Sequence, residues 1–195
     1  MANPQRTRES LLNAGRTEFA RYGLAGARVD RIAAQANVNK QRIYANFGNK
    51  EGFFEAVVED ALGDLLDAVS PSHTGTVEQK LGAYVKDVIE YHRKHPDLLR
   101  LLQWEALELR GDPSLTTTRA QHYREKVQVF AQHLELDEVE AAHILFAAIG
   151  LAVWPQVMPQ LASLIYAQSP KTAIAQAQAS APLIAAALAG VTLKK

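Results

Sequence analysis

Apolar residues recur at intervals of three and four along most of this 195-residue chain, which is the spacing of a helix with one buried face. No long stretch alternates in the way that a half-buried strand requires. The pattern therefore predicts an all-α protein of about nine helices, over residues 6–22, 29–36, 40–47, 50–69, 77–95, 96–109, 114–134, 138–154 and 170–189.

Polar residues with helix-capping chemistry stand at several of the predicted helix starts. Asn and Asp side chains accept hydrogen bonds from the free backbone N–H groups of a first turn, and a Thr-x-x-Gln pair does so reciprocally. Gly23 is expected to end the first helix, because glycine readily adopts the backbone conformation of a helix stop. We expect caps at Asn39, Asn49, Thr76 with Gln79, and Asp137 with Glu140.

The segment from Val29 to Phe47 predicts two short helices that meet at a tight turn. Asn37 stands at that turn, and asparagine tolerates the left-handed conformation that a tight helix stop needs. In the second helix Ile43 and Phe47 are four residues apart, so they lie on one face and anchor the helix inward. The opposite face of this helix-turn-helix is then exposed.

The exposed face of the second helix carries groups that suit the major groove of DNA. Lys and Arg pair with guanine, Gln pairs with adenine, and a small apolar side chain touches the thymine methyl group. Tyr44 and Lys50 are expected to hold phosphates, which fixes the register on the duplex. A solvated helical hairpin without a ligand would show the same apolar spacing. The candidate DNA-binding residues here are Asn39, Lys40, Gln41, Arg42, Tyr44, Ala45, Asn46 and Lys50.

The distribution of charge favours a nucleic-acid partner for this end of the chain. Residues 1–50 contain nine Lys or Arg and three Asp or Glu, so nine minus three gives +6, whereas the whole chain is neutral with 21 charges of each sign. The remainder must then carry −6. Such polarisation indicates a basic end that meets a polyanion and a body with another task.

A helix that ends in phenylalanine and glycine, the two-helix unit and a Tyr-x-x-Phe-x-x-Lys-Glu segment follow one another in residues 11–54. The residues concerned are Phe19, Gly23, Val29, Ile32, Ala33, Ala36, Val38, Lys40, Tyr44, Phe47, Lys50, Glu51 and Phe54. With these landmarks the segment resembles the N-terminal domain of the TetR family of transcriptional regulators. The chain departs from the family pattern at Arg28, Asn37, Asn39 and Gln41. We expect Arg28, which replaces a small hydroxyl residue, to reach a phosphate in place of the lost contact.

The resemblance implies a three-helix DNA-binding domain in residues 1–50 and a helical domain for effector binding and dimerisation in residues 51–195. It also implies a homodimeric repressor that a small-molecule effector releases from its DNA operator. The two reading helices of a dimer would enter successive major grooves about 34–36 Å apart, which predicts a palindromic operator.

The body of the chain offers candidate surfaces for both of its implied tasks. The very apolar helices over 138–154 and 170–189 are expected to pair with a second copy in a four-helix interface, as the last two helices of the resembled family do. A buried core within a monomer is the alternative. In the helices over 76–134, an effector pocket of aromatic and polar side chains is expected, although each alone is more often core or surface: Tyr84, Tyr91, Arg100, Trp104, Glu105, Tyr123 and Phe130.

Composition limits the remaining classes of protein. The chain has no cysteine, which excludes disulfides and cysteine-ligated zinc and fits a cytoplasmic protein. Its longest apolar runs, 144–155 and 182–193, are shorter than the roughly 20 residues of a membrane-spanning helix. We therefore expect no membrane contact.

No phosphate-binding loop, nucleophile elbow or metalloprotease motif occurs, so neither enzymatic activity nor a cofactor is expected. The rival hypothesis is a helical-bundle metal protein or enzyme, because Glu140 and His143 have the Glu-x-x-His spacing of di-iron bundles. Only one such motif is present, and His92 with His95 does not complete a ligand set.

Overall fold

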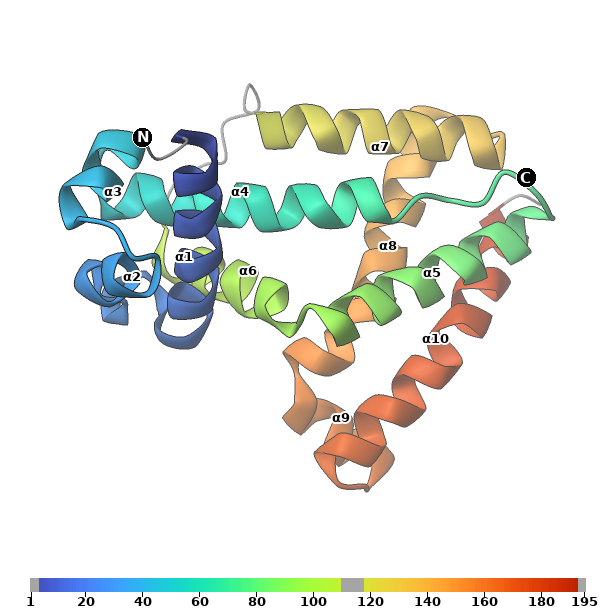
Figure 1. The fold of residues 1–195 in the computed structure, drawn as a ribbon. Helices are drawn as coiled ribbons and strands as arrows, with labels where there is room; N and C mark the ends of the chain where they lie inside the picture. Colours follow the sequence, from blue (N-terminus) through green and yellow to red (C-terminus); the bar gives the residue numbers. More distant parts are fainter. Residues whose placement is uncertain (1–3, 110–117, 193–195) are drawn as a thin grey trace. The chain divides into compact units, whose positions relative to one another are not determined.

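The computed structural model describes residues 4–109 and 118–192, and within these ranges it consists of ten α-helices without a strand (Figure 1). The all-α prediction is confirmed, whereas the predicted helix start at residue 114 lies outside the described residues. The helices are α1 (Pro4–Gly26), α2 (Val29–Gln35), α3 (Lys40–Phe47), α4 (Lys50–Ala68), α5 (Val77–Lys94), α6 (Pro96–Glu108), α7 (Thr118–Leu134), α8 (Glu138–Val157), α9 (Pro159–Tyr166) and α10 (Pro170–Thr192).

The described residues contain one helix more than the nine that the sequence predicted, because the segment after Pro155 forms the separate helix α9. Met158 leaves the helical conformation, with φ −123° and ψ 63°, as expected for a residue that precedes a proline. Pro159 then occupies the first position of α9, where its missing N–H costs no hydrogen bond. Pro155 and Pro159 interrupt the helical pattern here, so the sequence indicated no separate helix.

Each predicted N-cap side chain accepts a hydrogen bond, although at Asp137 the described residues form only this half of the predicted box with Glu140. The Asn39 side chain accepts a hydrogen bond from the Gln41 N–H at 2.9 Å, and the Asn49 side chain accepts one from the Gly52 N–H at 2.7 Å. Asp137 Oδ1 accepts from the second and third N–H groups of α8, at 2.9 Å each. The predicted Thr-x-x-Gln box is complete: the Thr76 N–H donates to the Gln79 side chain at 3.0 Å, and the Gln79 N–H donates back at 3.4 Å.

Tertiary contacts divide the described residues into two compact units. The first contains residues 4–64 and 95–109, which are α1–α3, most of α4, and α6; the second contains residues 65–94 and 118–192. These units follow contacts within the fold, whereas the predicted domains 1–50 and 51–195 were drawn by function. The functional division stays a prediction.

The first unit is built on a cluster of aromatic rings. Phe19 of α1 lies edge-on to Phe53 and Phe54 of α4, with ring centroids 5.5 and 5.1 Å apart, and all three side chains are fully buried. Such edge-to-face pairs add to the free energy of burying the rings. Gly15 lets α1 approach α4 closely, since a Cβ there would lie 2.8 Å from Phe53.

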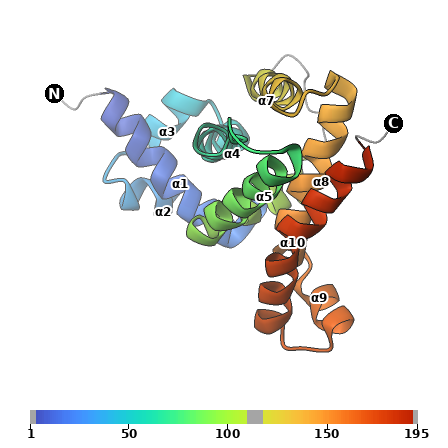
Figure 2. The same ribbon diagram turned by 90° about the vertical axis from the view of Figure 1, so that its right-hand side faces the viewer.

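The second unit packs α5, α8 and α10 against one another, and α7 lies against α8 (Figure 2). Its core combines Tyr84 and Phe130, whose rings meet edge-on at 4.6 Å, with many small alanines on α8 and α10. Small side chains let helices approach closely, but each of them contributes little apolar volume to the core.

Helix α8 is the one helix in the described part of the chain that is long and apolar enough to cross a membrane, by length and composition alone. This corrects the expectation that every apolar segment falls short, because the helix continues beyond the uninterrupted apolar run and tolerates two acidic residues at its start. A core helix of a water-soluble protein passes the same test. Only a third of its most apolar window is buried within the chain.

Candidate nucleic-acid interface

Helix α3 is fixed from beneath by two side chains at helical spacing. Ile43 is completely buried, and the half-buried Phe47 ring stacks on Phe53 at a centroid distance of 4.4 Å. Asn37 has the predicted left-handed conformation, with φ 54°, and so produces the sharp turn between α2 and α3. Together with the Asn39 cap, these contacts give the short α3 one orientation within its unit.

The remaining side chains of α3 form one exposed surface, as the apolar spacing predicted. All six are exposed, and within the helix Asn46 Nδ2 donates to the Arg42 carbonyl at 2.7 Å. The surface offers cations, amide groups, a phenol and a methyl group, which are the chemistries that read base edges. Its members are Lys40, Gln41, Arg42, Tyr44, Ala45 and Asn46.

Lys40 forms an ion pair with Asp30 of α2 at 2.9 Å. The hydrogen bond from Lys40 lowers the pKa of Asp30, and the same bond raises the pKa of Lys40. Both side chains are well exposed, and exposed pairs contribute little to stability. Lys40 is therefore able to exchange this carboxylate for a phosphate or a base.

Glu18 organises the start of α2 from within α1. Its buried carboxylate accepts hydrogen bonds from the Arg28 N–H at 2.8 Å and from Arg31 Nε at 2.8 Å. Burial disfavours the charged carboxylate, but the hydrogen bonds from Arg31 and the Arg28 N–H outweigh it and lower the pKa of Glu18. The Arg28 side chain itself stays exposed, whereas Arg31 is engaged within the protein and also lies over the Tyr22 ring.

Part of the basic charge of this end is neutralised internally. Arg16 pairs with Asp60 and Asp64 of α4, at 3.0 and 2.7 Å. Lys50, predicted to hold a phosphate, donates from Nζ to the Ala25 carbonyl at 3.2 Å. The net charge calculated from the sequence included every cation of this end, because the sequence does not show which side chains have partners within the protein. Exposed cations of the unit include Arg6, Arg8, Arg21, Arg28 and Arg42.

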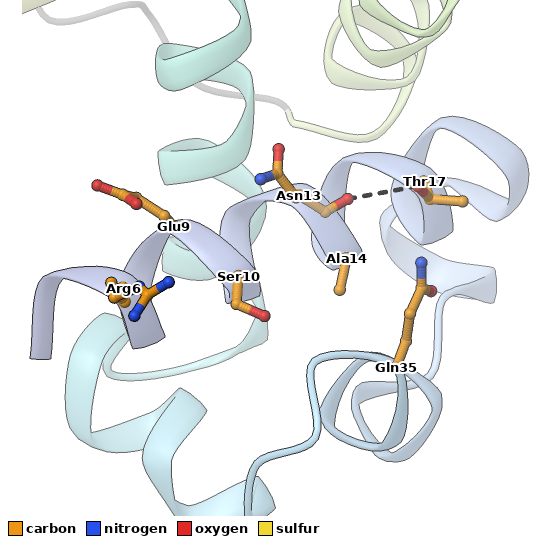
Figure 3. Close-up of a pocket in the computed structure, with 7 residues that line it drawn as sticks. All are labelled: Arg6, Glu9, Ser10, Asn13, Ala14, Thr17 and Gln35. Carbon is orange, nitrogen blue, oxygen red and sulfur yellow. Dashed lines mark hydrogen bonds between the residues drawn. The ribbon is translucent and has the colours of Figure 1, made fainter. Parts of the chain in front are cut away.

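A polar hollow of about 470 Å³ lies beside these elements, on α1 and the end of α2 (Figure 3). Ser10 Oγ donates to the Ala36 carbonyl at 3.4 Å, and Thr17 donates to the Asn13 carbonyl at 3.3 Å. No motif in the sequence marks these residues, although the spacing 6, 10, 13, 17 places four of them on one helix face. The hollow is lined by Arg6, Glu9, Ser10, Asn13, Ala14, Thr17 and Gln35.

The seven candidate effector residues fall into both units. In the second unit Tyr84 packs on Phe130, and burial, together with the nearby Tyr123, raises the pKa of Tyr84. Tyr91 is half-buried on the same helix as Tyr84. Arg100, Trp104 and Glu105 belong to the first unit, where the first two donate to the Ala20 carbonyl of α1. A ligand role for the set stays a prediction.

The rival metal hypothesis gains no further ligand in the described ranges, where no group of three or more His, Asp or Glu side chains could hold an ion. His143 is exposed, and the backbone N–H of Glu140 donates to the Asp137 cap. A pair of this kind does not fill a coordination sphere.

Comparison with known proteins gives two family matches that together cover most of the chain. The model of bacterial regulatory proteins of the tetR family matches residues 11–57, and the model of a tetracyclin repressor-like C-terminal domain matches residues 80–187. The first match contains the helix-turn-helix and its buttress α1. The second covers more than half of the sequence.

Individual relatives agree. The HTH-type transcriptional repressor SCO4008 of Streptomyces coelicolor is 39% identical over 165 residues, which is 82% of this chain and 83% of that protein. The repressor NicS of Pseudomonas putida is 31% identical over 52% of this chain and 49% of its own. The crystal structure of the transcriptional regulator SCO4942 from S. coelicolor has a TM-score of 0.64 at 29% identity and covers 91% of this chain and 97% of its own. The chain belongs to the TetR family, whose members are DNA-binding transcriptional regulators and not enzymes.

Proposed function

We propose that this protein is a homodimeric transcriptional repressor that binds a palindromic operator through α3 and leaves it when a small-molecule effector binds the second unit. The repressor role follows the relatives SCO4008 and NicS, which carry that description. As a DNA-binding regulator it would act in the cytoplasm. Its DNA role depends most on one observation: six exposed side chains of α3 stand on a completely buried Ile43.

The contacts with DNA divide by chemistry. Gln41, Arg42 and Ala45 are the groups on α3 best suited to base edges, because they combine an amide, a guanidinium and a methyl group. Tyr44, Arg28 and Lys50 border the helix and are proposed to contact phosphates. Lys50 would then have to exchange its hydrogen bond to the Ala25 carbonyl for a phosphate.

The proposed dimer is supported by apolar side chains that the second unit leaves uncovered. Phe146 of α8 is 83% exposed and Leu183 of α10 is 74% exposed, and Val139 and Trp154 continue the exposed face of α8. Water-soluble proteins rarely leave such contiguous apolar surface open, so a partner surface is expected to cover it. Two copies that bring together α8 and α10 would form a four-helix interface.

The effector is proposed to bind among the aromatic groups of the second unit. Tyr84, Tyr123 and Phe130 lie together there, and aromatic walls with a few hydroxyl groups are the usual makeup of small-molecule sites. For an effector to release DNA, it must bind more tightly to the conformation with low DNA affinity.

Selection of duplexes from a random pool tests the DNA function. The enriched sequences should share a motif with dyad symmetry, and Gln41→Ala should weaken binding to that motif. Gln132→Ala is the matched control, because Gln132 is an exposed glutamine on α7. A pool without enrichment, or equal affinity of the two variants, would contradict the assignment of α3.

Sedimentation analysis of Phe146→Glu tests the dimer separately. A buried charge in a helix–helix interface lacks a partner, so the variant should sediment as a monomer at concentrations where the natural protein is dimeric. Glu59→Gln provides a control at an exposed position of α4. If the variant stays dimeric, the dimer interface does not include this face of α8.

A further inference from the structure

Helix α1 is broken one turn before its end. Gly23 has φ 68° and ψ −177°, after which the chain resumes a last turn that closes with the Ala27 N–H on the Gly23 carbonyl at 3.2 Å. In an unbroken helix the Leu24 N–H would donate to the Ala20 carbonyl, four residues earlier. The break therefore leaves the Ala20 carbonyl without its helical donor. On the other side of the break, backbone N–H groups such as that of Leu24 lack a helical acceptor.

Helix α6 satisfies both sides of this break with three residues at spacing four. Arg100 Nε and Trp104 Nε1 donate to the Ala20 carbonyl, at 2.7 and 3.3 Å. The Glu108 carboxylate accepts hydrogen bonds from the N–H groups of Leu24 and Ala25. We call Arg100, Trp104 and Glu108 the α6 clasp.

Gly23 is required for this arrangement. A Cβ atom at that position would lie 2.8 Å from Trp104 Cδ2 and 3.0 Å from Glu108 Oε1, closer than side chains tolerate. The positive φ also disfavours any residue other than glycine. The break and the clasp are thus fitted to each other.

The broken turn leads directly into α2. Lys50 Nζ donates to the Ala25 carbonyl at 3.2 Å, Arg31 donates to the Gly26 carbonyl at 3.5 Å, and Glu18 accepts from the Arg28 N–H. The conformation of residues 23–26 therefore sets where α2 begins, and α3 follows after a tight turn. The apolar core side chains Phe19, Ile32 and Ile43 are fully buried and take no part in these hydrogen bonds.

We propose that Arg100, Trp104 and Glu108 are positioning residues for sequence-specific DNA binding, because they hold the break in α1 in the one conformation that aims α3. This rests on the proposed function of α3. Non-specific binding depends on charge and counterion release, whereas specific binding depends on how the reading helix is placed. Loss of the clasp then lowers specific affinity and leaves non-specific affinity unchanged.

Fluorescence anisotropy with the duplex selected by the natural protein, and with a scrambled duplex at the same salt concentration, tests this. Glu108→Ala should bind the selected duplex roughly tenfold more weakly, with unchanged affinity for the scrambled one. Glu108→Gln keeps an acceptor oxygen and should recover most of the loss. Glu55→Ala, at an exposed position of α4, controls for the removed charge.

If Glu108→Ala and Glu55→Ala have the same affinity for each of the two duplexes, the positioning role is overturned. Equal losses on both duplexes, or no recovery by Glu108→Gln, would also overturn it. If Glu108→Ala fails to fold, Trp104→Phe decides, since it removes the Nε1 donor while keeping an aromatic ring, and should lower specific affinity in the same direction. A natural protein that binds all duplexes alike would instead overturn the proposed function itself.

Discussion

The two units treat their large apolar side chains in opposite ways. In the first, Phe19, Phe53 and Phe54 are completely enclosed, and two of its three exposed large apolar residues are tyrosines with a polar tip. In the second, α8, α9 and α10 leave aliphatic and aromatic side chains in contact with solvent, among them Phe146, Leu164 and Leu183. The first unit therefore encloses most of its large apolar side chains, whereas the second leaves several of them exposed, as the proposed dimer interface would require.

Charges are also distributed differently. The first unit ties α1 to α2 and α4 through Glu18 and Arg16, which each meet more than one partner. The second buries one cation, Lys126 of α7, whose Nζ donates to backbone carbonyls at the end of α4. Ionic contacts in the first unit join α1 to α2 and α4, whereas the buried cation of the second binds carbonyls at a helix end.

Replacing one phenylalanine of each unit with alanine should give the largest difference between the units in the free energy of unfolding. Phe19→Ala should lower the free energy of unfolding by about 3–5 kcal/mol, because it removes a fully buried ring and leaves a cavity. Phe146→Ala should change it by less than about 1 kcal/mol in dilute monomer, since the side chain is exposed, but should weaken self-association. Urea denaturation at low and high protein concentration measures both effects. If Phe19→Ala and Phe146→Ala lower the free energy of unfolding equally in dilute protein, the contrast between the two units is contradicted.

Glu18→Gln should show how far the first unit depends on its internal ion pairs. Its loss should cost about 1–3 kcal/mol at pH 7, toward the lower value because Arg31 is 44% exposed. Since the folded pKa of Glu18 lies below its ordinary value of 4.5, the stabilisation is present above that pH and is lost as the pH falls below it. Thermal unfolding of both proteins from pH 7 to pH 3 should therefore converge in acid. If the difference in unfolding temperature between the two proteins is the same at every pH, this role of the Glu18 carboxylate is excluded.

The local structure of the first unit could be predicted from sequence because its signals are local. Asn39 and Asn37 act on backbone groups within a few residues, and Ile43 with Phe47 needs only the helical period. The partners of Arg16 and Glu108 lie more than 40 residues away, so no spacing rule identifies them. For the same reason the sequence did not show that Arg100 and Trp104 donate to the Ala20 carbonyl, and their ligand role stays a prediction.

Lys126→Met should have a smaller effect, and its pH dependence should lie in the alkaline range below 10.5, not in the acidic range of Glu18. The substitution leaves the carbonyls of Leu66 and Val69 without a donor but relieves the burial of a charge, so we expect a loss of order 1 kcal/mol at pH 7. Burial lowers the pKa of Lys126, and Asp67 offsets part of this. The unfolded chain then binds more protons between the lowered pKa and 10.5, so the stability of the natural protein should rise with pH there. The difference between the two proteins should grow with pH up to that value; a constant difference would exclude titration of Lys126.

The smallest expected effect distinguishes a helix cap from a DNA contact at Asn39. Asn39→Ala removes the acceptor of the Gln41 N–H and should cost about 0.5–1 kcal/mol, because the site is exposed. Asn39→Ser keeps a capping oxygen without adding charge, so it should restore both stability and affinity for the selected duplex if Asn39 serves only the helix. If Asn39→Ser restores stability but not affinity, the amide itself touches DNA, as the sequence predicted. Operator affinity and urea denaturation of the two variants, measured in the same buffer, therefore decide whether the first unit recognises DNA from the start of α3 or only from its exposed face.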